Sequence, residues 1–311
     1  MLPLYLAPMA ELGHRALREL IESFGGCDQY FSEMLSAAAV VSGGPFEKWY
    51  LDGGPDPARF VYQICGSDAG IIAKAVEELD KKESAGIDIN MGCSAPAIMK
   101  TGAGAAWLYT IDGAAEVLRA ARKRTGKRLS VKLRIGERDD FEYLLRFCLR
   151  LENEGVDLIT LHPRTTKEKF KRCARWDYIA GLNAALKIPV VGNGDIDSAE
   201  MCQSRAEKGG CRAIMLGRLA VREPWCFAAV KYGSRSKIDR EETAARFIGL
   251  LSEYQPKEFF QSRARRFFSY YCKNFTWGCY LQNCLARENS SAGMLNVIHN
   301  YLLEHPEERF C

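Results

Sequence analysis

The feature that most constrains this chain is a repeated alternation of short apolar runs with longer segments of helical periodicity. Eight runs rich in β-branched or apolar residues have strand length. They are Leu4–Ala7, Gln29–Phe31, Phe60–Ile64, Ile87–Asn90, Leu129–Leu133, Leu158–His162, Pro189–Gly192 and Ala213–Leu216. Segments with helical periodicity lie between them, such as Asp68–Lys81, Asp112–Arg124, Tyr143–Glu154 and Asp177–Leu186. Strands that alternate with helices predict a parallel sheet.

Eight such units within about 225 residues match the length of a closed (β/α)8 barrel, the TIM barrel fold. The alternative is an open doubly wound sheet. It is weaker because no Gly-x-Gly-x-x-Gly turn follows the first apolar run. We therefore predict an α/β barrel whose functional groups gather where strands end and the following loops begin.

The pattern changes after Lys231, where strand-like runs stop and helical segments follow. These segments are Glu241–Glu253, Pro256–Tyr271, Gly278–Arg287 and Ala292–Glu304. The stretch Tyr232–Lys237 contains Gly233 and Ser234 and is typical of a linker. The sequence thus predicts a barrel over residues 1–231 and a C-terminal helical domain over residues 238–311.

The composition of the 311 residues limits the classes of protein that remain. A hydrophobic fraction of 47% excludes global disorder, and a net charge of only +4 excludes a uniformly basic surface. No apolar run reaches the roughly 18 residues that span a bilayer, and the N-terminus lacks the basic region of a signal peptide. Twelve cysteines without the spacing of a disulfide scaffold favour a reducing compartment. We expect a cytoplasmic protein without a membrane partner, and its oligomeric state stays open.

The predicted helix Pro256–Tyr271 and the residues just after it mix basic and aromatic side chains. They are Lys257, Phe259, Phe260, Arg263, Arg265, Arg266, Phe267, Phe268, Tyr270, Tyr271 and Lys273. This mixture suits a nucleic-acid surface, because cations bind phosphates and rings stack on bases. It also suits an amphipathic helix whose rings pack in a core and whose basic groups are solvated. The residues alone leave both interpretations open.

The loop after the fourth strand carries a cysteine, Cys93. A glycine-rich segment, Lys100–Ala105, follows and can fold over it. A cysteine thiol is protonated at neutral pH, so Cys93 can serve as a proton donor, or as a nucleophile once it is ionised. The alternative is a buried structural cysteine.

The loops after the seventh and eighth strands hold glycine-containing turns, Gly192–Asp195 and Gly217-Arg218. In TIM barrels these loops frequently bind a phosphate through backbone amides and a helix N-terminus. Arg218 would add a charge-assisted contact. We predict a phosphate site here, against the alternative of two tight turns with a surface arginine.

Polar residues also end the third, fifth and sixth strands. Lys132 and Arg134 alternate with apolar neighbours, and charges that point into a barrel are costly unless they meet an anion or a polar ligand. His162 and Arg164 lie two residues apart. We interpret His162 as functional rather than as a satisfied core histidine, because Lys132 and a phosphate loop are expected nearby. Gln63 can hydrogen-bond a flat heterocycle.

No metal site is predicted, because no two histidines lie close in the chain and no Cys-x2-Cys pair occurs. Cys272, Cys279 and Cys284 do not have the spacing of a standard zinc site or iron–sulfur cluster. We expect them to pack in the helical core.

Together these residues resemble the tRNA-dihydrouridine synthases, a family of FMN-dependent enzymes that combine a (β/α)8 barrel with a C-terminal helical domain. The matching motifs are Ala7-Pro8-Met9, Gln63, Asn90–Cys93, Gly102–Ala105, Val131–Arg134, His162–Thr165, Asn193–Ile196, Gly217-Arg218 and Pro224-Trp225. The segment Arg263–Lys273 resembles the family's RNA-binding region more loosely. The sequence also departs from the family pattern. Ser94 replaces a usual proline, Pro163 a usual glycine and Phe267 a usual histidine. After Ala7-Pro8-Met9, Ala10–Gly13 stands where the family usually has x-Gly-x-Thr, and Leu17-Arg18 stands where it has Phe-Arg.

The resemblance implies a role for each matching residue. Cys93 would be the general acid, and Asn90 would lie beside the flipped uracil. The residues that would hold FMN are Ala7, Pro8, Met9, Gln63, Lys132, His162, Asn193, Gly194, Asp195, Gly217 and Arg218. Substrate or tRNA would also be bound by Arg134, Arg164, Arg266 and Lys273. Glu33 resembles an acidic position near the flavin.

The implied reaction reduces uridine to 5,6-dihydrouridine in tRNA. NADPH would reduce FMN, a hydride would pass to C6 of the uracil, and Cys93 would protonate C5. The base must leave its stack to reach the flavin, so the tRNA has to be gripped. One alternative is an FMN barrel oxidoreductase that acts on a small pyrimidine-like molecule, which has no need of the basic aromatic helix. The other is a non-catalytic RNA-binding protein. The modified uridine position and the choice of NADPH over NADH stay open.

Overall fold

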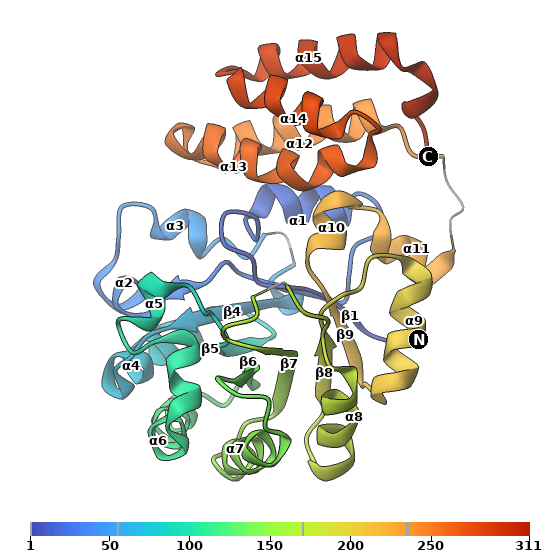
Figure 1. Cartoon of the computed structure of the whole chain (residues 1–311). Helices are drawn as coiled ribbons and strands as arrows, with labels where there is room; N and C mark the ends of the chain where they lie inside the picture. Colours follow the sequence, from blue (N-terminus) through green and yellow to red (C-terminus); the bar gives the residue numbers. More distant parts are fainter. Residues whose placement is uncertain (1, 55, 170, 234–236) are drawn as a thin grey trace.

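A computed structural model describes residues 2–54, 56–169, 171–233 and 237–311. Their strands form one parallel sheet that closes on itself, because β1 pairs with both β2 and β9 and β2 also pairs with β4. The strands are β1 (Leu4–Leu6), β2 (Gln29–Phe31), β3 (Leu35–Ser36), β4 (Phe60–Cys65), β5 (Gly86–Met91), β6 (Leu129–Gly136), β7 (Leu158–Thr165), β8 (Val190–Asn193) and β9 (Ala213–Leu216). The two-residue β3 is an addition beside β4. The fold is the predicted TIM barrel (Figure 1).

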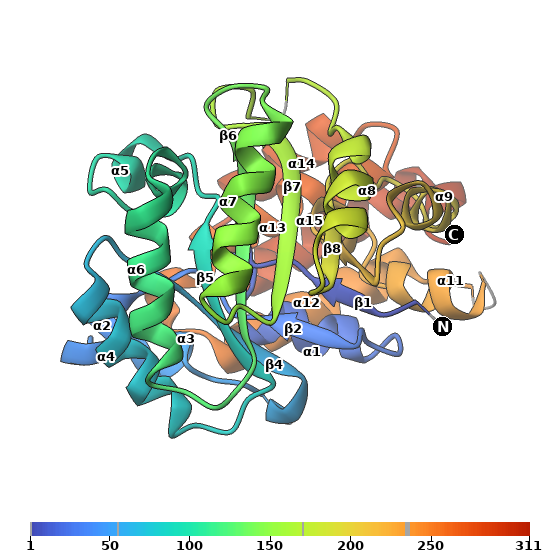
Figure 2. The same ribbon diagram turned by 90° about the horizontal axis from the view of Figure 1, so that it is seen from below.

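Helices surround the barrel, and their ends follow from the sequence. The helices are α1 (Arg15–Glu22), α2 (Ala37–Ser42), α3 (Glu47–Tyr50), α4 (Ala69–Asp80), α5 (Pro96–Met99), α6 (Ile111–Arg122), α7 (Phe141–Asn153), α8 (Trp176–Ala185), α9 (Ala199–Gly209), α10 (Arg218–Arg222) and α11 (Cys226–Tyr232). The chain also forms 3-10 helices at η1 (Pro57–Arg59) and η2 (Gly104–Tyr109). Asp68, Thr110, Asp140 and Ser198 cap α4, α6, α7 and α9 by accepting a backbone N–H. Figure 2 shows α4, α6, α7 and α8 in a row around the strands.

The C-terminal segment is helical and lies at one end of the barrel, above α1 and α10 (Figure 1). Its elements are α12 (Arg240–Tyr254), α13 (Lys257–Tyr271), η3 (Cys272–Asn274), α14 (Gly278–Arg287), α15 (Ser291–Glu304) and η4 (Pro306–Glu308). α12 packs on α1, and α13 packs on α10. The rings of Phe247 and Phe267 stack with centroids 3.7 Å apart in a core that is continuous with that of the barrel. Burial of these rings therefore holds the helices on the barrel.

The sequence pattern locates the strands well but ends two of them three residues too early. β6 runs past the predicted Leu133 to Gly136, and β7 runs past His162 to Thr165. Charged residues interrupt the apolar pattern there, while the two strands stay paired through a register shift between Arg134 and Gly136. Of the predicted linker, residues 234–236 lie outside the described residues.

Among the helices of the described residues, none is both long and apolar enough to cross a membrane.

Candidate active site

A cavity of about 250 Å³ opens at the carboxyl ends of the barrel strands. Most of the residues selected from the sequence line it: Ala7, Pro8, Met9, Gln63, Asn90, Cys93, Lys132, Arg134, His162, Asn193, Gly194, Asp195, Gly217 and Arg218. Ala10, Met34, Gly92, Ile196, Met215 and Leu216 complete the lining. Arg164, Arg266 and Lys273 lie outside it. Residues from Ala7 to Arg218 thus meet at one end of the barrel, as expected for residues that follow parallel strands.

A chain of buried hydrogen bonds leads from β5 to Cys93. Gln63 Nε2 donates to Asp88 Oδ2 at 2.7 Å, and Gln63 Oε1 accepts from Asn90 Nδ2 at 2.8 Å. Asn90 Oδ1 then accepts the backbone N–H groups of Gly92 at 3.1 Å and Cys93 at 2.9 Å. Each amide can take part in only one orientation, because an ionised carboxylate accepts and does not donate. Asp88 therefore fixes the orientation of both amides and the start of the cysteine loop.

Asp88 is a residue that the sequence analysis does not select. Its carboxylate is fully buried, and burial raises its pKa to about 6, although hydrogen bonds from Ser130 and Gln63 and the charge of Lys132 act the other way. The signal in the sequence is a carboxylate inside the apolar run Ile87–Ile89, which is costly unless it is hydrogen-bonded.

The glycine-rich segment folds back onto Cys93, as the sequence suggests. The Cys93 carbonyl accepts the N–H of Ala105 at 2.9 Å. Gly104 has a φ of +62°, and a Cβ there would lie 2.6 Å from the Cys93 carbonyl oxygen. Only glycine fits this position. The Cys93 side chain is partly exposed and borders the cavity.

β6 contributes two basic residues to the cavity, Lys132 and Arg134. Burial and the neighbouring Arg134 lower the pKa of Lys132 to about 8, against an opposing effect of Asp88. Arg134 is 7% exposed and donates to the carbonyl groups of Gly92, Thr165 and Lys169. It joins the loop after β5 to the end of β7 and the loop that follows β7, at the rim of the cavity.

The ends of β7 and β8 are joined by an ion-pair network. Arg164 Nη2 contacts Asp195 Oδ2 at 2.6 Å, and Arg218 Nη2 contacts Asp195 Oδ1 at 3.3 Å. Asp195 also accepts the N–H of Ala174 at 2.7 Å. Arg164 is 2% exposed, so it supports the cavity wall from behind. Burial raises the pKa of Asp195, but the hydrogen bonds from Arg164 and Ala174 and the charges of Arg164 and Arg218 together outweigh it, and the net shift is downward.

His162 is neutral in this arrangement. Burial, followed by the charges of Lys132 and Arg134, lowers its pKa well below the ordinary value. Its Nε2 lies 2.8 Å from Arg164 Nη1 and must accept, which places the ring proton on Nδ1. Gly194, with a φ of +127°, lies so close that a Cβ would come 2.8 Å from the His162 ring.

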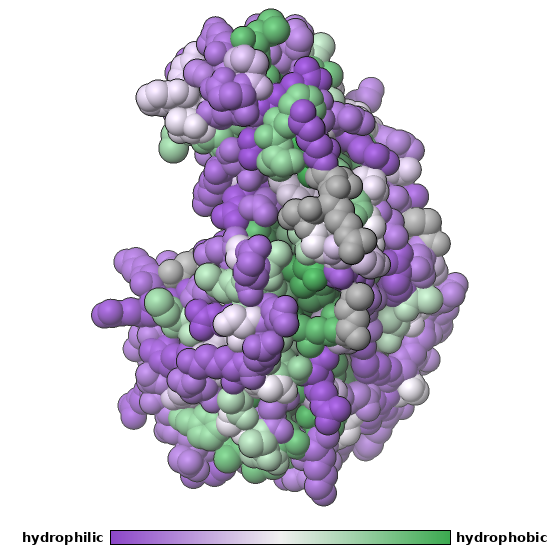
Figure 3. Space-filling view, turned by 90° about the vertical axis from the view of Figure 1, so that its right-hand side faces the viewer, coloured by the Kyte–Doolittle hydropathy of each residue, from purple (hydrophilic) through white to green (hydrophobic). Residues whose placement is uncertain are grey.

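The basic aromatic helix resolves into two faces. Phe267, Phe268 and Tyr271 are buried, as the amphipathic interpretation expects. Arg265, Arg266 and Lys273 are exposed. The Arg266 and Lys273 cations lie 5.7 and 5.3 Å from the Tyr270 ring. The surface is hollowed between the C-terminal helices and the barrel, and hydrophilic residues dominate the rim (Figure 3).

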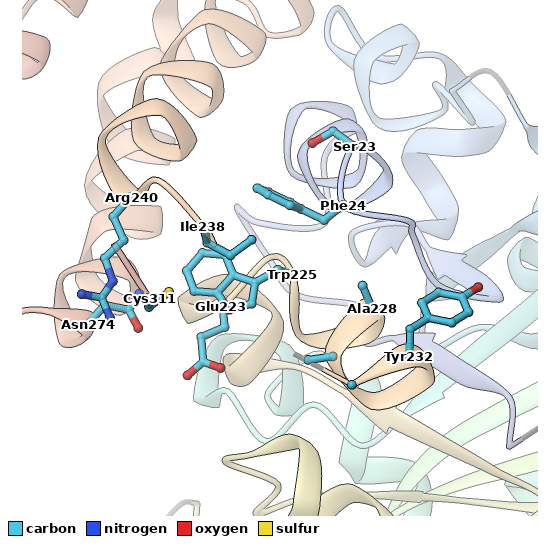
Figure 4. A pocket seen from close by; sticks show the side chains of 12 residues that line it. Ser23, Phe24, Glu223, Trp225, Ala228, Tyr232, Ile238, Arg240, Asn274 and Cys311 are labelled. Carbon is cyan, nitrogen blue, oxygen red and sulfur yellow. The ribbon is translucent and has the colours of Figure 1, made fainter. Parts of the chain in front are cut away.

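A second cavity, of about 560 Å³, lies where α1, α11 and the C-terminal helices meet. Figure 4 shows Phe24, Trp225 and Tyr232 on its walls, with Glu223 and Arg240 at one side. It contains none of the predicted site residues and lies away from the strand ends that carry Cys93.

The comparisons with known proteins identify the family of this chain. Residues 5–292 match the family model described as dihydrouridine synthase. The "Probable tRNA-dihydrouridine synthase" of Aquifex aeolicus (strain VF5) is 31% identical over 262 residues, which cover 81% of each chain. The "tRNA-dihydrouridine synthase B" of Vibrio cholerae is 34% identical over 74% of this chain and 71% of its own. The chain belongs to the dihydrouridine synthase family.

Solved structures support the fold alone. A 2-naphthoyl-CoA reductase has a TM-score of 0.58 at 12% identity over 74% of this chain and 50% of its own. Histamine dehydrogenase from Rhizobium sp. 4-9 has a TM-score of 0.55 at 13% identity over 80% of this chain and 49% of its own. This chain thus spans about half the length of each.

Proposed function

We propose that this protein reduces uridine in tRNA to 5,6-dihydrouridine, with FMN as its cofactor and NADPH as the reductant. One observation carries the proposal: a single cavity at the strand ends is lined by a thiol, two hydrogen-bonded amides and three basic side chains. These are Cys93, Gln63, Asn90, Lys132, Arg134 and Arg218. Membership of the dihydrouridine synthase family and the names of the relatives in Aquifex aeolicus and Vibrio cholerae support it.

The residues of the cavity fit a flavin mononucleotide. Gly194 and Gly217 leave backbone uncovered at the ends of β8 and β9, and Arg218 lies beside them, which suits a phosphate. Asp195 would act by orienting Arg218. Lys132, His162 and Gln63 would bind the polar edge of the ring, against the strip Ala7–Met9. When bound, reduced FMN supplies a hydride to C6 of the uracil.

Cys93 would donate the proton that C5 of the uracil requires. A protonated thiol suits this step better than a carboxylic acid that is already ionised at neutral pH. Asn90 would orient the uracil, because its Nδ2 carries two hydrogens and only one is needed for Gln63. Asp88 and Gln63 would keep Asn90 in that orientation.

Binding of tRNA would involve the exposed cations of the C-terminal helices. A uracil has to leave its stack to reach a cavity at the barrel end, and this costs energy that contacts elsewhere must offset. Arg266 and Lys273 present charges suited to phosphates. Arg134 and Arg164 would act indirectly, by holding the cavity wall.

The test is reduction of an unmodified tRNA transcript by the purified protein with FMN and NADPH, read by mass spectrometry of dihydrouridine. We expect Cys93→Ala to retain flavin and to lose about 10²–10⁴-fold in rate, the usual effect of general acid catalysis. Cys173→Ala removes an exposed thiol and serves as the matched control. A full rate for Cys93→Ala would exclude the acid assignment. Reduction of free pyrimidines in place of tRNA would favour the small-molecule alternative.

A further inference from the structure

One arginine of helix α13 in the C-terminal segment contacts a residue of the barrel. Arg263 forms an ion pair with Glu33, which lies two residues past the end of β2. The side chains are 3% and 7% exposed, so both charges have left water. The Arg263 guanidinium also lies 5.0 Å from the Phe259 ring and 5.5 Å from the Tyr50 ring.

Glu33 also binds the loop after β1. Its second carboxylate oxygen accepts the backbone N–H of Glu11 at 2.6 Å. Glu11 has a φ of +64°, a conformation that is costly for a residue other than glycine and has to be held by its surroundings. The same loop turns tightly, since the N–H groups of Leu12 and Gly13 both donate to the carbonyl of Met9.

The two segments tied by Glu33 both line the cavity. Met9 and Ala10 come from the loop after β1, and Met34 follows Glu33 directly. Arg266, one turn further along α13, lies 4.0 Å from the Glu11 carboxylate and adds a weaker tie to the same loop.

We propose that Arg263 is a positioning residue for the cofactor: docked α13 holds Glu33, and Glu33 holds the loop of residues 9–13 against the flavin. Without the guanidinium, the Glu33 carboxylate would be a buried charge without its partner, which is strongly unfavourable. It would turn toward water, and the Glu11 N–H would lose its acceptor. The cavity therefore forms in full only while the C-terminal helices are docked. The cofactor part of this inference rests on the proposed function.

The test uses the full-length protein and four variants. Arg263→Met removes the guanidinium and retains an apolar chain of similar length. Glu33→Gln retains an oxygen for the Glu11 N–H, and the double variant combines both changes. Arg309→Met is the matched control, because it breaks an ion pair with Asp239 within the C-terminal segment. Flavin fluorescence gives the FMN dissociation constant, and hydrogen exchange of the apoprotein reports on residues 9–13.

We expect Arg263→Met to raise the FMN dissociation constant about tenfold, because the loop of residues 9–13 loses its hydrogen bond to Glu33. The same variant should increase the rate of hydrogen exchange at residues 9–13 of the apoprotein. The double variant recovers most of both effects, and Arg309→Met changes neither. If Arg263→Met lowers only the melting temperature and leaves both readouts unchanged, the pair is structural and the proposal is wrong. Hydrogen exchange needs no flavin, so a wild-type protein that fails to bind FMN would refute the proposed cofactor without deciding the role of Arg263.

Discussion

At the scale of single residues, the position of an ionisable group relative to the cavity distinguishes groups that would bind a ligand from groups that position other side chains. Asp88 is fully buried and Lys132 is half-buried, and both have displaced pKa values, in the direction that favours the neutral form. Lys132 borders the cavity, whereas Asp88 contacts Ser130 and Gln63. We therefore assign ligand binding to Lys132 and orientation of the amides to Asp88.

Affinity for FMN should fall as the pH rises through the pKa of Lys132, which burial lowers to about 8. Below that pH the ammonium is charged and attracts the anionic cofactor. Above it, binding has to take up a proton, so the affinity falls by up to about tenfold per pH unit. Isothermal titration between pH 7 and 9 measures this. Lys132→Arg stays charged and should flatten the profile. A wild-type affinity that is constant over the range would contradict the assignment.

Two replacements of Asp88 should show whether its hydrogen-bond acceptor or its negative charge matters. Asp88→Asn can still offer an oxygen to Gln63, whereas Asp88→Leu leaves Gln63 Nε2 buried without an acceptor, at a cost of about 1–3 kcal/mol. The raised pKa of Asp88 means that its ionised form costs stability above about pH 6, and the Asn variant avoids that cost. We expect Asp88→Leu to bind FMN more weakly and to alter the alkylation rate of Cys93, and Asp88→Asn to do neither. Equal behaviour of the two variants would argue against the amide chain.

At the scale of elements, the ends of strands are where sequence reasoning succeeds most. Parallel strands with apolar residues on both faces are easily recognised, and the residues that follow each strand must meet at one end of a barrel. Gln63, Asn90 and Cys93 could be placed together for this reason. The same reasoning fails for Asp88 and Arg263, because their partners come from other strands or from another part of the chain. It also ends β6 and β7 early, because Arg134 and Arg164 break the apolar pattern.

The turn after β8 should depend on Gly194. Alanine there would have to adopt a φ of +127° and would meet the His162 ring at 2.8 Å. We expect Gly194→Ala to destabilise the protein by about 1–3 kcal/mol and to reduce its FMN content. Gly249→Ala is the matched control, because nothing lies within 4 Å of the new methyl group in α12. It should stabilise the protein by about 1 kcal/mol. Thermal unfolding of both variants measures the difference, and shifts of the same sign would be inconsistent with this account.

At the scale of the whole molecule, the C-terminal helices serve the barrel in two ways. Their inner face packs rings on α1 and α10 and places Arg263 beside Glu33. Their outer face exposes Arg265, Arg266 and Lys273. If one face of α13 packs on the barrel and the other binds tRNA, as we propose, both kinds of side chain are needed along it.

Loss of the outer cations should weaken tRNA binding in a salt-dependent way. We expect the double variant Arg266→Ala, Lys273→Ala to bind tRNA more weakly and to lower the slope of log affinity against log salt by about 0.7–0.9 for each phosphate contact that is lost. Lys74→Ala with Lys123→Ala removes two exposed charges from α4 and the end of α6, away from the C-terminal helices, and is the control. Filter binding at several salt concentrations gives the slopes. An unaltered slope would make Arg266 and Lys273 solvated surface charges.

The central claim is that this chain makes dihydrouridine in tRNA through Cys93. The most direct measurement is mass-spectrometric mapping of dihydrouridine in tRNA from cells that lack the gene, complemented with the wild type or with Cys93→Ala. The account predicts that dihydrouridine is lost at one or more defined positions, returns with the wild type and stays absent with Cys93→Ala. An unchanged map in the deletion strain, or full recovery with Cys93→Ala, would contradict it.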